Sequence, residues 1–218
     1  IDDFFSFKIL KEKFLKNNKA DIITSFSMFY DLENPLKFIK DIYKSLSKEG
    51  VWVFEQSYLP SMIDTQSFDT ICQEHLEYYT LSQINWMFKA CNMKILDFSL
   101  NDTNGGSIVV YASKKTSSIR ENIKKINKFL IKEKNNGFLK TNYWDSFKKK
   151  TNSNIAKIKD FLKKIQNNNQ IIIGLGASTK GNVLLQYLNI SPNQVLAIGE
   201  VNKEKFNKYT PGSNIPII

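Results

Sequence analysis

Two short apolar runs with one amphipathic segment between them constrain the fold of this chain more than any other feature. Residues 21–27 and 51–57 both carry apolar side chains and end on serine. Between them, apolar residues recur at helical spacing over residues 36–46, after Asn34-Pro35 and before Gly50. Asparagine is a favoured helix N-cap, proline fits the first turn, and glycine commonly follows the last turn. The pattern predicts a strand, a helix closed by Gly50 and a second strand, which is the repeating unit of a parallel sheet.

The next stretch predicts one helix and two more strands. Thr80 and Gln83 have the spacing of a capping box and precede an apolar helix face. Residues 93–100 and 107–112 have strand character and are separated by turn-forming residues. We therefore expect the first part of the chain, residues 1–113, to end on an antiparallel pair of strands.

Residues 114–169 are rich in lysine and are expected to connect two α/β units. About half of the 31 basic residues lie between positions 114 and 164, so the formal net charge of +10 is largely local to this stretch. Two runs of helical spacing are separated by Asn-Asn-Gly at 135–137, which predicts two amphipathic helices. The first predicted helix has this apolar line: Ile119, Ile123, Ile126 and Leu130.

A second alternating unit follows over residues 170–218. A predicted strand at 171–173 leads into a glycine-rich turn at 174–181, then into a helix and another strand. Glycines at such a turn let backbone N–H groups approach a phosphate. Threonine stands at the third glycine position of the dinucleotide pattern, although Glu200 follows where such a fold places its ribose-binding acid. Three interpretations stay open: a plain turn, a phosphate or nucleotide contact, or a NAD site.

The chain contains one histidine, His75, and two cysteines. These counts exclude the usual four-ligand zinc site and a disulfide framework, so we expect no metal centre. Three carboxylates, a thiol and two phenols lie around His75 between positions 68 and 79. From spacing alone, a solvated Glu–His pair and a general base tuned by Glu74 both stay open.

The segment Asn104-Gly105-Gly106-Ser107 also has two interpretations. Asn-Gly strongly favours a hairpin turn. Glycines without side chains would equally let the backbone approach a ligand.

Composition argues against two kinds of partner. Arg120 is the only arginine, whereas reading DNA bases and phosphates relies on arginine forks. No apolar run approaches the roughly 20 residues of a membrane span, and no signal-peptide pattern occurs. We expect a cytoplasmic protein without membrane or nucleic-acid partners, with lysine-mediated nucleic-acid binding through residues 114–164 as a weaker alternative.

Taken together and in order, these motifs resemble the family of S-adenosylmethionine-dependent sugar C-methyltransferases. The resemblance in the first part lies in four segments: 28–32, 53–56, 68–75 and 104–107. Three further segments resemble that family's C-terminal domain: 174–182, 200–202 and 209–216.

The resemblance implies an α/β fold that combines the second half of a Rossmann-like class I methyltransferase sheet with a second, truncated Rossmann-like unit. It implies C-methylation of a nucleotide-linked keto-sugar, a small-molecule partner, with S-adenosylmethionine as methyl donor. His75 would remove the proton from the carbon next to the keto group, and Glu74 would orient or stabilise the His75 imidazole. The resulting enolate would attack the methyl group. The implied substrate-binding residues are Ser27, Asp31, Tyr78, Asn104, Gly105, Lys180 and Asn182. The implied cofactor-binding residues are Ser25, Phe26 and Gln56.

The sequence departs from the family pattern in several places. Some members have tyrosine where Cys72 stands and histidine where Asp31 stands. The family's glycine-rich cofactor loop and its zinc module have no counterpart here, so we expect both ends to be cut and the chain alone to be inactive as a methyltransferase. Asp2-Asp3-Phe4 could still touch the cofactor. The alternative is a non-catalytic nucleotide- or partner-binding module that uses only the turn at 174–181.

Overall fold

The computed structural model describes residues 4–16, 18–138 and 140–218, so Asp2 and Asp3 lie outside the described residues. The chain divides into two compact units. The first comprises the residues up to Thr65 together with Glu74–Lys140, and the second comprises Gln66–Gln73 with Thr141–Ile218. The boundary at Lys140 falls inside the predicted connector, and the three-part division stays a prediction.

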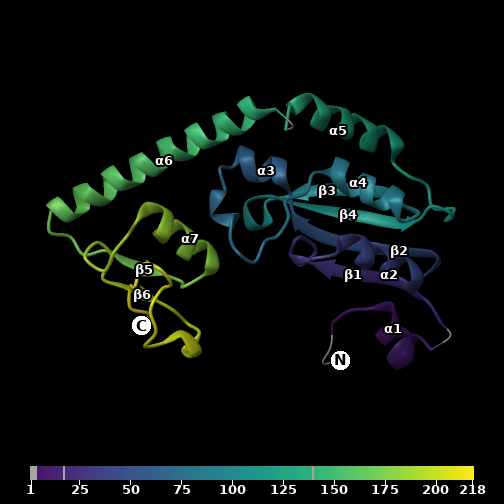
Figure 1. The fold of residues 1–218 in the computed structure, drawn as a ribbon, viewed down its shortest axis with the longest axis horizontal. Helices are drawn as coiled ribbons and strands as arrows, with labels where there is room; N and C mark the ends of the chain where they lie inside the picture. The colour runs from purple at the N-terminus through teal and green to yellow at the C-terminus, as the bar shows by residue number, and fades with distance from the viewer. Residues whose placement is uncertain (1–3, 17, 139) are drawn as a thin grey trace. The chain divides into compact units, whose positions relative to one another are not determined.

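A four-stranded sheet forms the centre of the first unit, with the strand order β1-β2-β4-β3 (Figure 1). β1 (Ala20–Phe26) runs parallel to β2 (Leu46–Ser57), and α2 (Pro35–Ser45) lies between them in the sequence. β4 (Ser107–Lys114) pairs antiparallel with both β2 and β3 (Met93–Asn101). The predicted strand–helix–strand unit, the final antiparallel pair and the α/β class are confirmed.

α2 ends earlier than predicted, at Ser45 rather than at Gly50. Asn34 caps its start as expected, because the side-chain oxygen accepts a backbone N–H from the first turn. The residue after the helix, Leu46, already has extended backbone angles and pairs with Ala20 of β1. Gly50 instead lies within β2, where the absence of a side chain allows close approach to β1: a Cβ there would lie 2.8 Å from the carbonyl oxygen of Ala20.

α4 (Leu81–Ala90) begins with the predicted capping box. The Thr80 hydroxyl accepts the backbone N–H of Gln83, and the Gln83 side-chain oxygen accepts the backbone N–H of Thr80 at 2.7 Å. Ile84 and Phe88 of this helix are fully buried. The prediction for this helix is confirmed.

One face of the sheet carries the core of the first unit. Trp52 and Phe54 of β2 are fully buried there, and their rings stack with centroids 4.4 Å apart. Side chains of α2, α4 and α5 (Ile123–Asn136) join the same hydrophobic cluster. Because neighbouring strand residues point to opposite faces, the register places other large apolar side chains on the opposite face, where they are exposed: Ile22, Phe26 and Tyr111.

The lysine-rich stretch forms two helices, as predicted, with one difference at the start. The side chain of Asn122 caps α5, so the helix begins at Ile123 and Ile119 precedes it. Gly137 ends α5 in the left-handed conformation, with a φ of 78°. α6 (Thr141–Asn167) follows.

The second unit contains a smaller α/β arrangement. β5 (Ile173–Leu175) and β6 (Ala197–Gly199) form a parallel pair, and α7 (Thr179–Leu188) connects them. Ile155 of α6 joins their hydrophobic cluster. The predicted order of strand, turn, helix and strand is confirmed.

The segment Gln66–Gln73 follows α3 (Leu59–Asp64) in the sequence but belongs to the second unit. The ring of Phe68 lies 5.4 Å from the ring of Tyr187, measured between centroids. The Gln66 side chain accepts a hydrogen bond from the hydroxyl of Thr151. The motif at residues 68–79 is therefore divided between the two units.

Candidate active site

Two loops of the first unit are joined at the carboxyl end of β1. The first loop follows β1 and contains one helical turn, Phe29–Asp31. The second loop precedes α4. The carbonyl oxygen of Tyr30 accepts hydrogen bonds from the backbone N–H groups of Leu76 and Glu77, each at 3.1 Å. In open α/β sheets, ligands commonly bind at the carboxyl ends of the strands, where such loops meet.

Asp31, Glu74 and His75 form a cluster where the two loops meet. The ring of His75 packs against the ring of Tyr30, with centroids 4.4 Å apart. Asp31 interacts electrostatically with both Glu74 and His75. Burial raises the pKa of Asp31 above its ordinary value; the charge of His75 opposes this rise and that of Glu74 adds to it. The structure thus brings together the candidate base and two of its predicted partners.

Tyr78 and Tyr79 lead from His75 toward α4. Tyr78 is half-buried, whereas Tyr79 is buried. Burial raises the pKa of Tyr79 to about 12, and the neighbouring Glu77 contributes to the rise. The carbonyl oxygen of Tyr79 accepts the backbone N–H of Leu59 at 3.0 Å, which ties this stretch to the start of α3.

Gln56, near the carboxyl end of β2, has a buried side-chain amide. Its side chain is fully buried, and neither Oε1 nor Nε2 has a hydrogen-bond partner among the residues that the structure describes. An unsatisfied buried polar group costs about 1–3 kcal/mol. A buried amide in this state calls for a hydrogen-bond partner that the described residues do not supply.

The two other predicted cofactor positions lie on β1. The hydroxyl of Ser25 accepts a hydrogen bond from Nε1 of Trp52 at 3.0 Å, so this side chain serves the core. Phe26 lies on the opposite face and is 55% exposed. Ser27 begins the following loop with a φ of 51°, and its N–H donates to the carbonyl oxygen of Glu55.

The turn between β3 and β4 packs against α3. Gly106 has a φ of 122°, and a Cβ there would lie 2.3 Å from the Cβ of Ser61. The hydroxyl of Thr65 donates to the carbonyl oxygen of Gly105 at 2.9 Å. Gly106 therefore serves a turn and a close internal contact, while Asn104 is exposed with a φ of 54°.

In the second unit, the glycine-rich turn joins β5 to α7. Gly176 has a φ of 85°, and the Ser178 side chain caps α7 by accepting the N–H of Gly181 at 3.1 Å. Lys180 and Asn182 lie in the first turn and are half-buried. Oδ1 of Asn182 is buried and has no hydrogen-bond partner within the described ranges. A helix start with a lysine beside it suits an anionic group.

Glu200 is engaged by the turn itself. Its carboxylate accepts the backbone N–H groups of Ala177 at 2.9 Å, Val201 at 2.8 Å and Asn202 at 3.1 Å. The hydrogen bonds from Asn202, Val201 and Ala177 lower the pKa of Glu200 to about 2, and Lys205 at 3.5 Å adds a smaller effect. A carboxylate used in this way is not available to ribose hydroxyls, which weakens the NAD interpretation.

One buried carboxylate was missed from the sequence, that of Glu133 in α5. Its side chain is 4% exposed and accepts hydrogen bonds from the start of α4. A usable signal was present. Glu133 falls at helical spacing from Ile126 and Leu130, so an acid lies on the apolar face of a lysine-rich helix.

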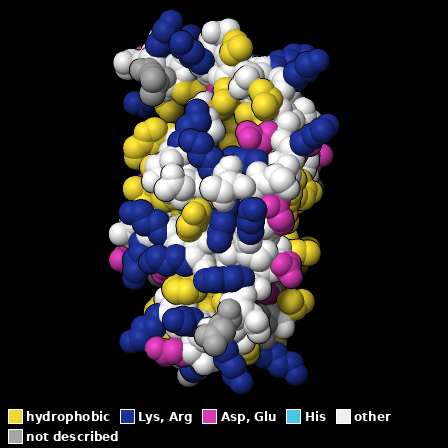
Figure 2. Space-filling view, turned by 90° about the vertical axis from the view of Figure 1, so that its right-hand side faces the viewer, with side chains coloured by type: hydrophobic (Ala, Val, Ile, Leu, Met, Phe, Trp, Pro, Cys, Tyr) yellow, Lys and Arg dark blue, Asp and Glu magenta, His cyan; other side chains and the backbone are white. Residues whose placement is uncertain are grey.

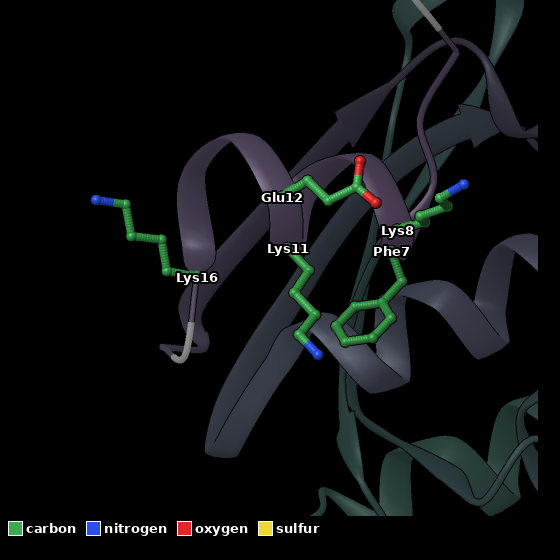
Figure 3. A pocket seen from close by; sticks show the side chains of 5 residues that line it. All are labelled: Phe7, Lys8, Lys11, Glu12 and Lys16. Atoms are coloured by element: carbon green, nitrogen blue, oxygen red, sulfur yellow. The ribbon is translucent and has the colours of Figure 1, made fainter.

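A depression of about 500 Å³ lies on α1 (Phe7–Leu10) and the helical turn that follows it (Figure 3). Lys8 and Lys16 point in opposite directions there, so they do not converge on one anion. None of the sequence-predicted site residues is among its lining residues: Phe7, Lys8, Lys11, Glu12 and Lys16.

Within residues 4–16, 18–138 and 140–218, no helix is long and apolar enough to cross a membrane, and no group of three or more His, Cys, Asp or Glu side chains could hold a metal ion. On the face displayed in Figure 2, lysine and arginine side chains are interspersed with acidic and apolar ones.

Solved structures show distant likenesses. The YcgJ protein from Bacillus subtilis is 13% identical, covers 48% of this chain and 65% of its own, and has a TM-score of 0.36. An O-methyltransferase family 2 protein from Planctomyces limnophilus is 16% identical, covers 44% of this chain and 30% of its own, and has a TM-score of 0.37.

Comparison with known sequences is more specific. The C-methyltransferase NovU from Streptomyces niveus is 24% identical over 213 residues, which are 98% of this chain and 50% of that protein. The chain thus spans about half the length of this curated relative. Residues 3–97 match a methyltransferase domain family, and residues 102–218 match the C-methyltransferase C-terminal domain. The resemblance to C-methyltransferases is confirmed, and with more than half of its length in that second match, the chain belongs to the C-methyltransferase family.

Proposed function

We propose that this chain forms the substrate-activating part of an S-adenosylmethionine-dependent C-methyltransferase that acts on a nucleotide-linked keto-sugar. The cluster of Asp31, Glu74 and His75 is the observation that carries the proposal. Methylation of such a carbon needs a base to remove its proton and a polar group at the neighbouring carbonyl oxygen. The cluster contains both kinds of group on loops that are joined at one strand end.

His75 is the proposed base. Its unprotonated ring nitrogen takes the proton from the carbon next to the keto group. The electron pair of the C–H bond then forms the enolate double bond, and the former carbonyl oxygen gains the negative charge. Glu74 stabilises the imidazolium that results. Tyr30 packs against the imidazole ring and limits its movement.

Asp31 is proposed to act at the keto oxygen. An ionised carboxylate only accepts hydrogen bonds, whereas a protonated one can donate to an oxygen that gains charge. Burial raises the pKa of Asp31 more than the charge of His75 lowers it, and Glu74 adds to the rise. The protonated form therefore persists to a higher pH than in an ordinary aspartate, which supports a donor role.

The cofactor part of the proposal rests on Gln56. Its buried amide has the donor and acceptor capacity to pair with polar groups of S-adenosylmethionine, and Phe26 offers an exposed ring. When bound, S-adenosylmethionine supplies an electrophilic methyl group. Ser25 contributes through its backbone, since its side chain is engaged with Trp52.

The start of α7 is proposed to hold the diphosphate of the substrate. Lys180 supplies positive charge, and the N–H groups of the first turn point toward the helix start. Oδ1 of Asn182, which has no partner among the described residues, can accept a hydrogen bond from the nucleoside. The alternative, a nucleotide-binding module without catalysis, uses the same turn. It differs in predicting nucleotide binding without any chemistry at the sugar.

Deuterium incorporation tests the proton-transfer step in this chain alone. In D₂O, a nucleoside-diphosphate keto-sugar should gain deuterium at the carbon next to the keto group without any methyl donor. His75→Ala should slow this exchange about 10²–10⁴-fold, the usual contribution of a general base. Lys180→Ala is the matched control: it should raise the sugar-nucleotide concentration needed for half-maximal exchange but leave the maximal rate.

Two results would contradict the proposal. If the exchange rate is unchanged in His75→Ala, a group other than His75 removes the proton. Nucleotide binding that depends on Lys180, with no exchange above the uncatalysed rate in the unaltered chain, supports the non-catalytic module instead.

A further inference from the structure

Glu133 of α5 is buried, yet both oxygens of its carboxylate are fully used. Oε1 accepts the backbone N–H of Leu81 at 2.8 Å and the hydroxyl of Tyr58. Oε2 accepts the backbone N–H of Ser82 at 2.8 Å and the Ser82 hydroxyl at 2.5 Å. Four donors thus converge on one carboxylate, and the chain itself supplies all of them.

This carboxylate lies at the N-terminus of α4. A helix start leaves N–H donors without partners inside the helix and carries partial positive charge. The Thr80 side chain accepts a hydrogen bond from the backbone N–H of Gln83, while Glu133 accepts those from Leu81 and Ser82. Hydrogen bonds to a charged acceptor are stronger than those between neutral groups, so Glu133 stabilises the start of α4 in addition to the capping box.

The start of α4 is also one end of the loop that carries His75. Tyr79 precedes the cap and forms a bridge with Tyr58, the residue whose hydroxyl donates to Glu133. On the other side, the loop is attached to the carbonyl oxygen of Tyr30. The stretch that carries His75 is therefore held at Tyr30 on one side and at the start of α4 on the other, where Glu133 contributes to the attachment.

We propose that Glu133 is a positioning residue for His75. α5 lies in the part of the chain that matches the C-methyltransferase C-terminal domain, and its carboxylate secures a loop of the part that matches the methyltransferase domain. The catalytic meaning of this contact rests on the proposed role of His75. The contact's effect on the imidazole can be measured independently of that role.

Glu133→Gln tests the inference in the full chain. Glutamine keeps the shape of the glutamate side chain, but its NH₂ group cannot accept hydrogen bonds. Wherever that group replaces a carboxylate oxygen, the buried N–H of Leu81 or Ser82 is left without an acceptor. His75 is the only histidine, so its ring protons are unambiguous in an NMR spectrum, and the Tyr30 ring displaces their signals. We expect these signals to move toward the values of free histidine. The amides of Leu76 and Glu77 should exchange about tenfold faster.

Glu121→Gln is the matched control, because it removes an equal charge from a carboxylate that pairs with Lys94 at 3.7 Å. It should leave the His75 signals unchanged. If Glu133→Gln does not fold, Ser82→Ala keeps the carboxylate and both backbone donors and should give a smaller displacement in the same direction.

Unchanged His75 signals in whichever of these two variants folds would overturn the inference. Displaced signals in Glu133→Gln, combined with sugar exchange that does not respond to His75→Ala, support the positioning contact and reject the proposed function. The two ideas can therefore fail separately.

Discussion

The rings of Tyr30 and His75 lie 4.4 Å apart between centroids, with 58° between their planes. The two residues belong to different loops. The carbonyl oxygen of Tyr30 also accepts the two backbone hydrogen bonds that hold the residues after His75. One residue without an acid–base role in the proposed reaction therefore supports the imidazole through both its side chain and its backbone.

Replacing Tyr30 by leucine should loosen the imidazole while keeping the backbone acceptor. Tyr30 is 7% exposed, so the lost ring contacts should lower the free energy of unfolding by about 1–3 kcal/mol. Chemical denaturation measures this loss, and NMR should show His75 ring protons without their ring-current displacement. Tyr30→Phe keeps the ring and should keep the displacement. Equal His75 signals in both variants would mean that the ring contact does not hold the imidazole.

Asp31→Asn should stabilise the protein at neutral pH. The pKa of Asp31 is raised on folding, chiefly by burial, so the folded state binds this proton more tightly than the unfolded state. Ionised Asp31 therefore opposes folding above its folded pKa, and this effect disappears as the pH falls below the ordinary value of 3.8. Unfolding free energies of the two proteins should differ at pH 7 and converge near pH 3. A difference that grows on acidification would contradict the assigned direction.

Gln56→Met should separate stability from cofactor binding. Methionine has a similar shape and removes a fully buried amide that has no partner in the described part of the chain, so stability should rise by about 1 kcal/mol. Thermal denaturation measures this gain. Under the proposed function, calorimetric titration should show weaker binding of S-adenosylmethionine or its demethylated product. Lower stability in the variant would show that the amide does have a partner.

Gly106→Ala should destabilise the turn between β3 and β4 by about 1–3 kcal/mol. The new Cβ would lie 2.3 Å from that of Ser61, at a φ of 122° that side chains rarely adopt. Gly137→Ala also acts at a positive φ, but its nearest neighbour is 3.6 Å away, so it should cost less. Adding Ser61→Gly to Gly106→Ala should recover part of the loss. No recovery in the double variant would assign the whole cost to the backbone.

Glu200→Gln should loosen the glycine-rich turn of the second unit. The pKa of Glu200 falls from 4.5 to about 2 on folding because backbone N–H groups bind the carboxylate. Its contribution to stability is thus complete above pH 4.5 and is lost as the pH falls toward 2. Hydrogen exchange of the Ala177, Val201 and Asn202 amides should be faster in the variant at pH 7. The neighbouring Glu204→Gln should leave these amides protected, and equal exchange in both variants would refute the assignment.

Local signals in the sequence were sufficient where a structure depends on residues close in the chain. The capping box of Thr80 and Gln83 and the Asn34 cap of α2 are contacts within one helical turn, so their spacing predicts them. The predicted end of α2 was wrong because the true end depends on a residue that is distant in the sequence. Helical spacing continues to Leu46, but pairing with Ala20 across the sheet places that residue in β2.

The candidate site shows the same division. His75 could be named from composition, because the chain has only one imidazole, and the family resemblance added Glu74 and Asp31. The proximity of Asp31 to His75 could not be predicted from local spacing, because it depends on backbone hydrogen bonds between Tyr30 and a loop that is distant in the sequence. The role of Glu133 was not predicted, because its hydrogen-bond donors lie in α4 and at the start of α3.

The sequence by itself therefore determined which side chains can move a proton, and it predicted most of the helices and strands, although not α1, α3 or the end of α2. These properties belong to single residues or to neighbours within a turn. Only the tertiary structure decided that Tyr30 supports His75, that Glu133 secures the start of α4, and that the amide of Gln56 is buried without a partner among the described residues. Those relationships arise from packing between segments far apart in the chain, which no local spacing specifies.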